Sequence, residues 1–237
     1  MNRLQHVRET IKENIKNSLS YDDAEFILLD YNSTDGLEEW VKNNLYEYIE
    51  KEKLKFLQTK EPKYWVAAHA KNITQKIAKG DVICNLDSDI FIPDNFCTYI
   101  REIFSKPKVV MAFNSLDSFG NNGCAGIIAT KKEDFYSVNG YDENIYLGWG
   151  CDDMNYQFRV RMQNELELIV PPPLCKCINH SNELRVENCQ SKDIFLTQEL
   201  SVNMCHDAAN NKDYIVNKSI HWGKADLVVN FKENIKI

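Results

Sequence analysis

Two aspartates separated by one residue, Asp87 and Asp89, come directly after the apolar run DVICNL (81–86). Such a run predicts a buried strand, so both carboxylates are expected where the strand gives way to a loop. Carboxylates placed there, together with diphosphate oxygens, suit Mg²⁺ or Mn²⁺. The cation would stabilise the charge that builds up on a departing diphosphate. An Asp-Ser-Asp sequence also fits a solvated turn, but its position after a buried strand favours a metal site.

A second cluster, Gly-Trp-Gly-Cys-Asp-Asp at 148–153, combines two glycines, an aromatic ring and two adjacent acids. The acids begin an expected helix, where carboxylates often only interact with the helix dipole. That simpler explanation leaves out Trp149, which has the character of a mobile platform for stacking on a sugar ring. An acid of this pair that faces the cleft can take a proton from an acceptor hydroxyl.

The elements that must position these clusters alternate between helix and strand over the first half of the chain. Helices are expected over 2–19, 37–49 and 69–79, and strands over 25–30, 54–58 and 81–86. Such alternation predicts a parallel sheet with helices on both faces. Ligands of these sheets collect at the carboxyl ends of the strands, where Asp30, Asp87 and Asp89 are expected.

The pattern is looser after Asp89. We expect a helix over 95–104, strands over 108–113 and 126–130, a turn at 119–123, a helix over 151–163 and another near 192–205. The chain from Pro171 onward otherwise reads as irregular. Since no repeat, low-complexity tract or linker is present, a single domain over 1–237 is expected.

Composition limits the function further. The chain of 237 residues is 43% hydrophobic and 27% charged, an ordinary globular mixture. Its formal net charge of -7, without a concentrated basic segment, argues against nucleic-acid binding. An acidic protein that binds a phosphorylated ligand needs a local neutraliser, for which a divalent cation is the obvious candidate.

No apolar run is long enough to predict an integral membrane segment, and the start MNRLQHVRETIKENIK lacks the apolar core of a signal peptide. Several of the eight cysteines stand inside apolar runs, where a free thiol behaves as a small buried hydrophobe. We therefore expect mostly reduced thiols and a cytoplasmic location.

Several motifs, taken in order, resemble the GT-A glycosyltransferases: LLDYNSTDG, KNITQKIAKGDVICNLDSD, GIIATKKEDFYSVNGYDENIYLGWGCDD and CINHS. The second half most resembles the β-1,4-galactosyltransferase-type branch and its bacterial relatives. The resemblance runs from about Asn2 to His180. It implies an α/β fold with a Rossmann-like, mostly parallel sheet covered by helices on both faces. A nucleotide-binding half would span about 1–113 and an acceptor and catalytic half about 114–237.

The resemblance also implies residue-level roles. Asp30 would contact the nucleotide base or ribose, Asp89 would be the principal metal ligand, and Asp87 a ribose or metal contact. Trp149 would pack against sugar, Asp152 would bind donor or acceptor hydroxyls, and Asp153 would be the catalytic base. His180 would be a further metal ligand. Three weaker candidates for donor contacts are Lys71, Asn72 and Gly126, for each of which a purely structural role is the alternative.

The implied reaction is the metal-dependent transfer of a sugar from a UDP-sugar donor of the Gal, GalNAc or Glc type to a saccharide or glycan hydroxyl. Inversion is expected because the related retaining polypeptide N-acetylgalactosaminyltransferases typically carry Asn where this chain has Asp153, and Asp-x-His where it has Asp-x-Asp. The alternatives are a catalytically silent nucleotide- or sugar-binding protein and, more weakly, a nucleotidyltransferase. The latter usually has a Gly-rich phosphate loop near its start, which this sequence lacks.

Two features depart from the family pattern. A GT-A domain normally opens with a strand, whereas this sequence begins directly with a helix, so a groove in the sheet and weakened solubility or nucleotide affinity are expected. In addition, Cys175, Cys177, His180 and Cys189 have the residue types of a structural zinc site. Their spacing is unlike that of common zinc modules.

Overall fold

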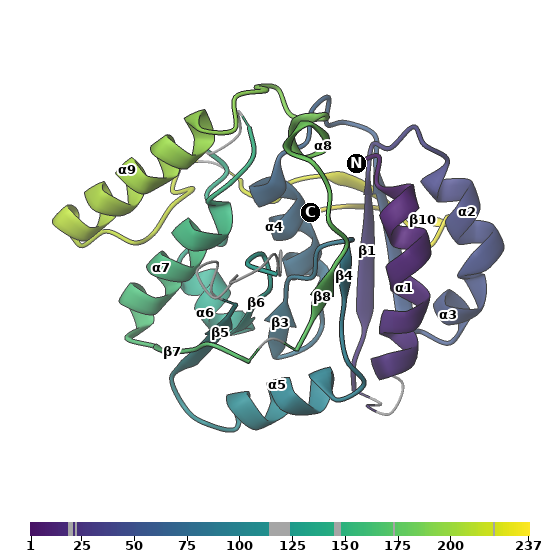
Figure 1. Ribbon diagram of the computed structural model, residues 1–237, viewed down its shortest axis with the longest axis horizontal. Coiled ribbons are helices and arrows are strands. Elements are labelled where there is room, and N and C mark those ends of the chain that lie inside the picture. Colours follow the sequence, from purple (N-terminus) through teal and green to yellow (C-terminus); the bar gives the residue numbers. More distant parts are fainter. Residues whose placement is uncertain (19–20, 22, 114–123, 145–147, 173, 220) are drawn as a thin grey trace.

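The computed structural model describes residues 1–237 except 19–20, 22, 114–123, 145–147, 173 and 220 (Figure 1). The turn expected at 119–123 lies outside the described residues. The helices are α1 (Leu4–Ser18), α2 (Leu37–Asn44), α3 (Tyr46–Glu50), α4 (Ala67–Ile77), α5 (Phe96–Phe104), α6 (Lys132–Ser137), α7 (Asp152–Asn164), α8 (Asn182–Val186) and α9 (Leu196–Asn211). The strands are β1 (Phe26–Tyr31), β2 (Leu54–Thr59), β3 (Val82–Cys84), β4 (Ile90–Phe91), β5 (Val109–Ala112), β6 (Ile128–Lys131), β7 (Glu167–Ile169), β8 (Lys176–Cys177), β9 (Asp226–Val229) and β10 (Glu233–Lys236).

The strands form two four-stranded sheets and a small two-stranded one. Their orders are β1-β2-β9-β10, β3-β6-β5-β7 and β4-β8. Only β1·β2 and β5·β7 pair in parallel among the described residues, and the other pairs are antiparallel. The α/β class is as expected, but the expectation of one mostly parallel sheet is corrected to mixed sheets. The cause is that β6, β8, β9 and β10 return against their neighbours.

Helices cover both faces of the first sheet. On one face, α1, α2 and α3 pack against β1 and β2 through a buried apolar cluster that includes Val7, Val41 and Phe56. On the other face, α4 packs against β2 and β9 through Ile73, Leu57 and Leu227. Figure 1 shows α1, α2 and α3 together on one side of β1. The apolar residues whose helical spacing predicts α1 therefore form the face that this helix buries.

The second sheet is covered in the same way. Alternate residues of β5 point to opposite faces, so Val109 and Met111 join a cluster with α5, whereas Val110 and Ala112 join one with α6 and α7. The fully buried Arg159 of α7 donates hydrogen bonds to Asn155 at 2.7 Å and to the Gly140 carbonyl at 3.0 Å. These bonds tie α7 to the 139–141 turn and fix the helix whose first turn carries Asp152 and Asp153.

Two local expectations are wrong. The helix expected over 37–49 is two helices, because Leu45 leaves helical geometry with φ -125° and ψ 3°. The chain after Pro171 is not otherwise irregular: besides α9, which agrees with the helix expected near 192–205, it forms β8, α8, β9 and β10. Leu227 and Val229 of β9 are buried beside β2, so this tail shares a sheet with the first two strands of the chain.

All eight cysteines are free thiols. In the part of the chain that the structure describes, no helix has the length and apolar character needed to cross a membrane.

Candidate functional site

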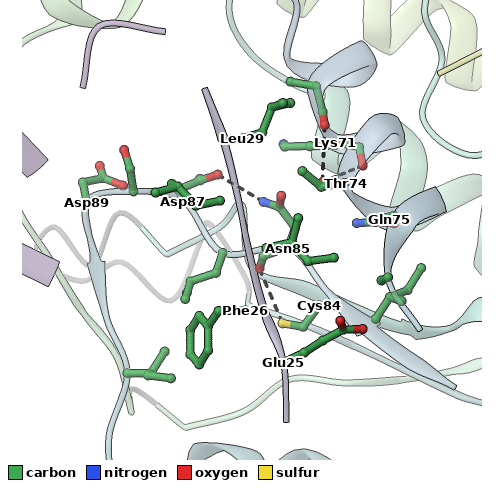
Figure 2. Close-up of a pocket in the computed structure, with 18 of the residues that line it drawn as sticks. Glu25, Phe26, Leu29, Lys71, Thr74, Gln75, Cys84, Asn85, Asp87 and Asp89 are labelled. Carbon is green, nitrogen blue, oxygen red and sulfur yellow. Dashed lines mark hydrogen bonds between the residues drawn. The ribbon is translucent and has the colours of Figure 1, made fainter. Parts of the chain in front are cut away.

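One cavity of about 910 Å³ runs from the gap between β1 and β3 to the start of α7. Predicted site residues that line it are Lys71, Asp87, Asp89, Trp149, Asp152, Asp153 and His180. They come from α4, the turn after β3, the segment before α7, the first turn of α7 and the segment after β8. Residues far apart in the sequence thus share one cavity (Figure 2 shows the Lys71, Asp87 and Asp89 part).

The pairing of β4 with β8 brings Asp89 and His180 together. Ile178 donates its backbone N–H to the Asp89 carbonyl at 2.8 Å, which continues the antiparallel ladder by one residue beyond each strand. His180 Nε2 then lies 2.9 Å from Asp89 Oδ2, and both side chains are largely buried. Cys177 adds a thiol 3.5 Å from the same carboxylate oxygen. The predicted pair is therefore in direct contact.

This pair has the chemistry of an open cation site. A hard divalent cation is usually held by one or two protein carboxylates together with substrate phosphates, and imidazole is a common ligand of transition metals. No group of three or more His, Cys, Asp or Glu side chains that could enclose a metal occurs among the described residues. Asp89 and His180 fit a Mn²⁺ that also takes ligands from its substrate, whereas Asp87 does not join them in a closed cage.

Lys71 contacts both acids at the start of α7, Asp152 and Asp153. Its Nζ lies 2.7 Å from Asp152 Oδ2 and also contacts Asp153 Oδ1. Lys71 and Asp152 are buried, whereas the Asp153 side chain keeps 24% of its surface exposed to the cavity. Lys71 therefore bridges two adjacent carboxylates at the start of α7 and offsets part of their charge, and Asp153 is the one of the two that a ligand can reach more readily.

The charges in this cluster shift one another's protonation. Burial raises the pKa of Asp153 to about 7, helped by Asp152 and Asp87 and opposed by Lys71. Burial alone would lower the pKa of Lys71, but Asp152, Asp153 and Asp87 outweigh it and raise that pKa well above its usual value. A carboxyl that titrates near neutrality while it faces a cavity has the properties of a general base.

Asp87 interacts both with Asp89 of the Asp89–His180 pair and with Lys71 of the cluster at the start of α7. Asn85 donates to Asp87 Oδ1 at 3.1 Å and to the Gly126 carbonyl at 2.8 Å. Burial raises the pKa of Asp87, and the negative charge of Asp89 adds to the rise while Lys71 opposes it. A Cβ on Gly126 would overlap Asp87 Oδ2 and stand 3.5 Å from Asp153 Oδ2. Gly126 thus makes room for Asp87, which is the structural role left open for it by the sequence.

Gly126→Ala is expected to destabilise the fold by about 2 kcal/mol, since the added methyl group overpacks the Asp87 carboxylate. Urea unfolding measures the loss. In an Asp87→Ala background the same substitution should cost close to nothing, because its neighbour is gone. An equal cost in both backgrounds would contradict this role of Gly126.

Trp149 lines the cavity, and the Arg185 guanidinium lies 4.9 Å from the centre of its ring. Such stacking favours the cation by about 1 kcal/mol. The chain then turns into α7 through two residues of positive φ, Gly150 at 110° and Cys151 at 63°. This left-handed turn directs Asp152 and Asp153 toward Lys71. Residues 145–147 before it lie outside the described residues.

Three predicted donor contacts, Asp30, Asn72 and Gly126, are not among the described residues that line the cavity. Asp30 is buried and accepts hydrogen bonds from Ser33 N at 2.8 Å and Gln58 Nε2 at 3.4 Å. Asn72 is fully buried, and its amide bonds the Tyr141 backbone through both its oxygen and its nitrogen. Asp30 and Asn72 thus bond other parts of the chain, and their role as donor contacts stays a prediction.

Three residues that the sequence analysis did not single out also line the cavity: Arg3, His6 and Arg185. His6 packs edge-on against His180 with ring centres 5.6 Å apart, and its Nδ1 has no hydrogen-bond partner among the described residues. The two arginines add positive charge to the cavity lining of an otherwise acidic chain. Arg3 lies in the N-terminal segment, His6 in α1 and Arg185 in α8, so no motif or spacing in the sequence indicates that they belong to one site.

The cysteine-rich segment does not gather the four ligands of a zinc site. Cys175 is buried in the apolar cluster beneath α5, Cys177 contacts Asp89, and Cys189 Sγ donates to the Arg185 carbonyl at 3.8 Å. The zinc alternative raised by these residue types is therefore not supported by their arrangement.

Comparisons with known proteins give a family and a fold. A family model described as "Glycosyl transferase family 2" matches residues 1–150. No curated protein matches the chain.

Among solved structures, a mannosyltransferase from Pyrobaculum calidifontis, PcManGT, in complex with GDP-Man and Mn²⁺, is 20% identical with a TM-score of 0.60. The match covers 75% of this chain and 54% of that one, so the chain spans about half of that relative. TarS from S. aureus is 12% identical with a TM-score of 0.59, covering 90% of this chain and 71% of that one. Drosophila β1,4-galactosyltransferase 7 is 17% identical with a TM-score of 0.47, covering 76% and 79%.

Proposed function

The chain belongs to glycosyl transferase family 2, and we propose that this glycosyltransferase moves a sugar from a UDP-sugar of the Gal, GalNAc or Glc type to a saccharide hydroxyl, with inversion and with Mn²⁺ or Mg²⁺. One observation carries the proposal. A carboxylate that titrates near neutrality, Asp153, shares a cavity with the Asp89–His180 pair, which fits a divalent cation.

The donor diphosphate belongs at the Asp89 end of the cavity. Asp89 and His180 would hold the cation, which when bound supplies positive charge to the diphosphate oxygens. Arg3 and Arg185 line the same cavity and add fixed positive charge. The complex of PcManGT with GDP-Man and Mn²⁺ supports this choice of cofactor by analogy of fold.

Asp153 would act on the acceptor. As the acceptor oxygen forms its bond to the anomeric carbon, Asp153 takes the hydroxyl proton, and the anomeric carbon's bond to the diphosphate breaks with its electron pair leaving on the diphosphate. Lys71 fixes the position of Asp153 and lowers its pKa relative to burial alone. Trp149 would pack against a sugar ring beside the base, and Asp152 would bind a sugar hydroxyl.

Inversion follows from this assignment. A carboxylate base on the acceptor side directs the attack at the face of the sugar opposite the departing diphosphate, in a single displacement. The second candidate, a silent nucleotide-binding protein, shares the donor site and differs only in turnover.

Activity is expected to fall as the solution becomes acidic. Asp153 must be deprotonated to accept a proton, so kcat/KM should fall about tenfold per pH unit below the pKa of about 7 and level off above it. A divalent cation near Asp87 lowers the pKa of neighbouring acids, so an inflection at or below pH 7 agrees with the account. Initial rates between pH 5 and pH 9 provide the test, and a flat profile would contradict it.

Nucleotide release tests the function itself. The protein is incubated with UDP-Gal, UDP-GalNAc, UDP-Glc and GDP-Man and a panel of saccharide acceptors, in Mn²⁺ and in EDTA, and the anomeric configuration of the product is read by NMR. Metal-dependent, acceptor-stimulated release of UDP with an inverted product is expected. Retained configuration would overturn inversion, and tight UDP binding without release would favour the silent alternative.

A further inference from the structure

The aromatic ring of Tyr141 lies against the Lys71 ammonium, and the proposed reaction gives this ring no role. Lys71 Nζ is 5.1 Å from the centre of the ring. Lys71 lines the large cavity on the side that α4 forms (Figure 2), whereas Tyr141 lies fully buried behind it. The attraction between a cation and an aromatic face is strongest where water is excluded, as it is here.

The contacts of Lys71 show what a ring at this place can do. Its ammonium has three N–H donors, and the described residues supply oxygens for two of them, Asp152 Oδ2 at 2.7 Å and Asp153 Oδ1. A lysine side chain is a flexible stem, so two adjacent carboxylates alone leave it free to lean toward either acid. The Tyr141 ring is a third neighbour that attracts the charge without offering a competing oxygen. It therefore restricts where Nζ can lie.

The backbone of Tyr141 is fixed by the residue next to Lys71. Asn72 accepts a hydrogen bond from the Tyr141 N–H at 2.8 Å and donates one to the Tyr141 carbonyl at 2.9 Å. Asn217 Nδ2 donates to the same carbonyl at 2.8 Å. Since Asn72 follows Lys71 directly in α4, one short stretch of helix sets both the position of the ammonium and the position of the ring.

The ring itself is held by Tyr156. The two rings stack with centres 4.1 Å apart and an angle of 22° between their planes. Tyr156 lies in α7, one turn after Asp152, and its hydroxyl shares a hydrogen bond of 2.9 Å with Thr130 Oγ1 of β6. The Tyr141 ring therefore contacts both the helix that carries the two acids and the lysine that bonds them.

The hydroxyl of Tyr141 takes no part in this arrangement. It is buried and has no hydrogen-bond partner among the described residues. A buried hydroxyl without a partner costs stability. The face of the ring, and not its polar group, is thus the part of Tyr141 that can act on Lys71.

We propose that Tyr141 is a positioning residue, whose ring face keeps the Lys71 ammonium in contact with both Asp152 and Asp153 and so keeps Asp153 available as the base. The inference rests on the proposed function, in which Asp153 accepts the acceptor's proton. The groups around Asp153 are Lys71 of α4, Asp152 of its own helix, Asp87 after β3 and the Tyr141 phenol. The two acids reinforce the rise in the pKa of Asp153 and Lys71 opposes it, so a displaced lysine leaves Asp153 protonated up to a higher pH.

The test compares Tyr141→Phe with Tyr141→Leu in the full chain. Phenylalanine keeps the ring face and removes only the unbonded hydroxyl, whereas leucine is an apolar side chain without an aromatic face. The titration of the Asp153 carboxyl is followed by NMR, with Asp153→Asn to assign its signal. The midpoint is expected to rise by about one pH unit in Tyr141→Leu and to stay unchanged in Tyr141→Phe. Tyr136→Leu, which removes an exposed aromatic from α6, is the control and should leave the midpoint unchanged.

A third variant keeps the test valid if leucine at this position prevents folding. Trifluorophenylalanine at position 141 keeps the ring but weakens its attraction for a cation, so the midpoint should rise as in Tyr141→Leu. The pH–rate profile of kcat/KM should move with the midpoint in each variant.

An unchanged midpoint in a folded Tyr141→Leu or trifluorophenylalanine variant would overturn the proposal. An equal rise in Tyr141→Phe would also overturn it, because the hydroxyl would then be the acting group. The titration needs no sugar donor, so its failure is separate from a failure of the proposed glycosyl transfer.

Discussion

Asp153→Asn is expected to lower kcat by about 10³-fold while metal-dependent nucleotide binding remains within a few-fold of the original chain. The reason is that Asp153 is the acid that faces the cavity with a pKa raised to about 7, whereas Asp89 and His180 form a separate pair in the same cavity. Asparagine keeps the size of the side chain but cannot accept the proton. Nucleotide-release assays measure kcat, and calorimetric titration measures nucleotide binding.

A matched control is Glu133→Gln, which removes an exposed first-turn acid from α6 instead of α7. It should leave kcat unchanged. The thermal stability of Asp153→Asn at pH 8 should equal or exceed that of the original chain, because the raised pKa means that the ionised form of Asp153 destabilises the fold at that pH. Retained turnover in Asp153→Asn would remove it from the role of base.

Lys71→Met is expected to reduce both stability and activity. The buried Lys71 contacts Asp152 and Asp153, so its loss leaves adjacent carboxylates without their counter-charge, at a cost of about 3 kcal/mol at pH 8. Without Lys71 the pKa of Asp153 rises further. The stability penalty is therefore present above the raised pKa values and fades as the pH falls through them, since protonated carboxyls no longer repel.

The same shift gives Lys71→Met a kinetic signature. Its pH–rate profile should move to higher pH, with partial recovery of kcat/KM toward pH 9, and Lys71→Arg should retain more activity because it keeps the charge. Lys76→Met is the control from the same helix, since Lys76 bonds the Trp222 carbonyl at 2.5 Å instead of the cavity acids. A profile unchanged in shape would show that Lys71 does not set the protonation of Asp153.

The sequence predicts the elements that local pattern specifies. The apolar periodicity of α1 and the apolar runs of β1, β2 and β3 place those elements within a few residues of their observed bounds. Strand orientation and the structure of the C-terminal tail depend on pairing between segments that are distant in the sequence, so local pattern does not predict them. The residues of β9 carry little local signal, and their position beside β2 follows from burial of Leu227 and Val229.

The candidate site shows the same limit. Asp89, His180, Asp152 and Asp153 are predicted by motif and are found in one cavity, while Asp30 and Asn72 match the same motifs but lie in hydrogen-bond networks outside it. Motif matching specifies residue types and cannot determine which way a side chain turns. His6 and Arg3 belong to the cavity only because α1 packs beside β4, a contact that no spacing within α1 indicates.

The most direct test of the account is a calorimetric titration of the protein with UDP, in Mn²⁺ and in EDTA, carried out in parallel on Asp89→Asn and on the surface control Asp213→Asn. The account predicts binding that requires Mn²⁺ in the original chain and in Asp213→Asn and that disappears in Asp89→Asn, since Asp89 and His180 would hold the cation that receives the diphosphate. Binding of equal strength in EDTA, or in Asp89→Asn with Mn²⁺, would contradict it.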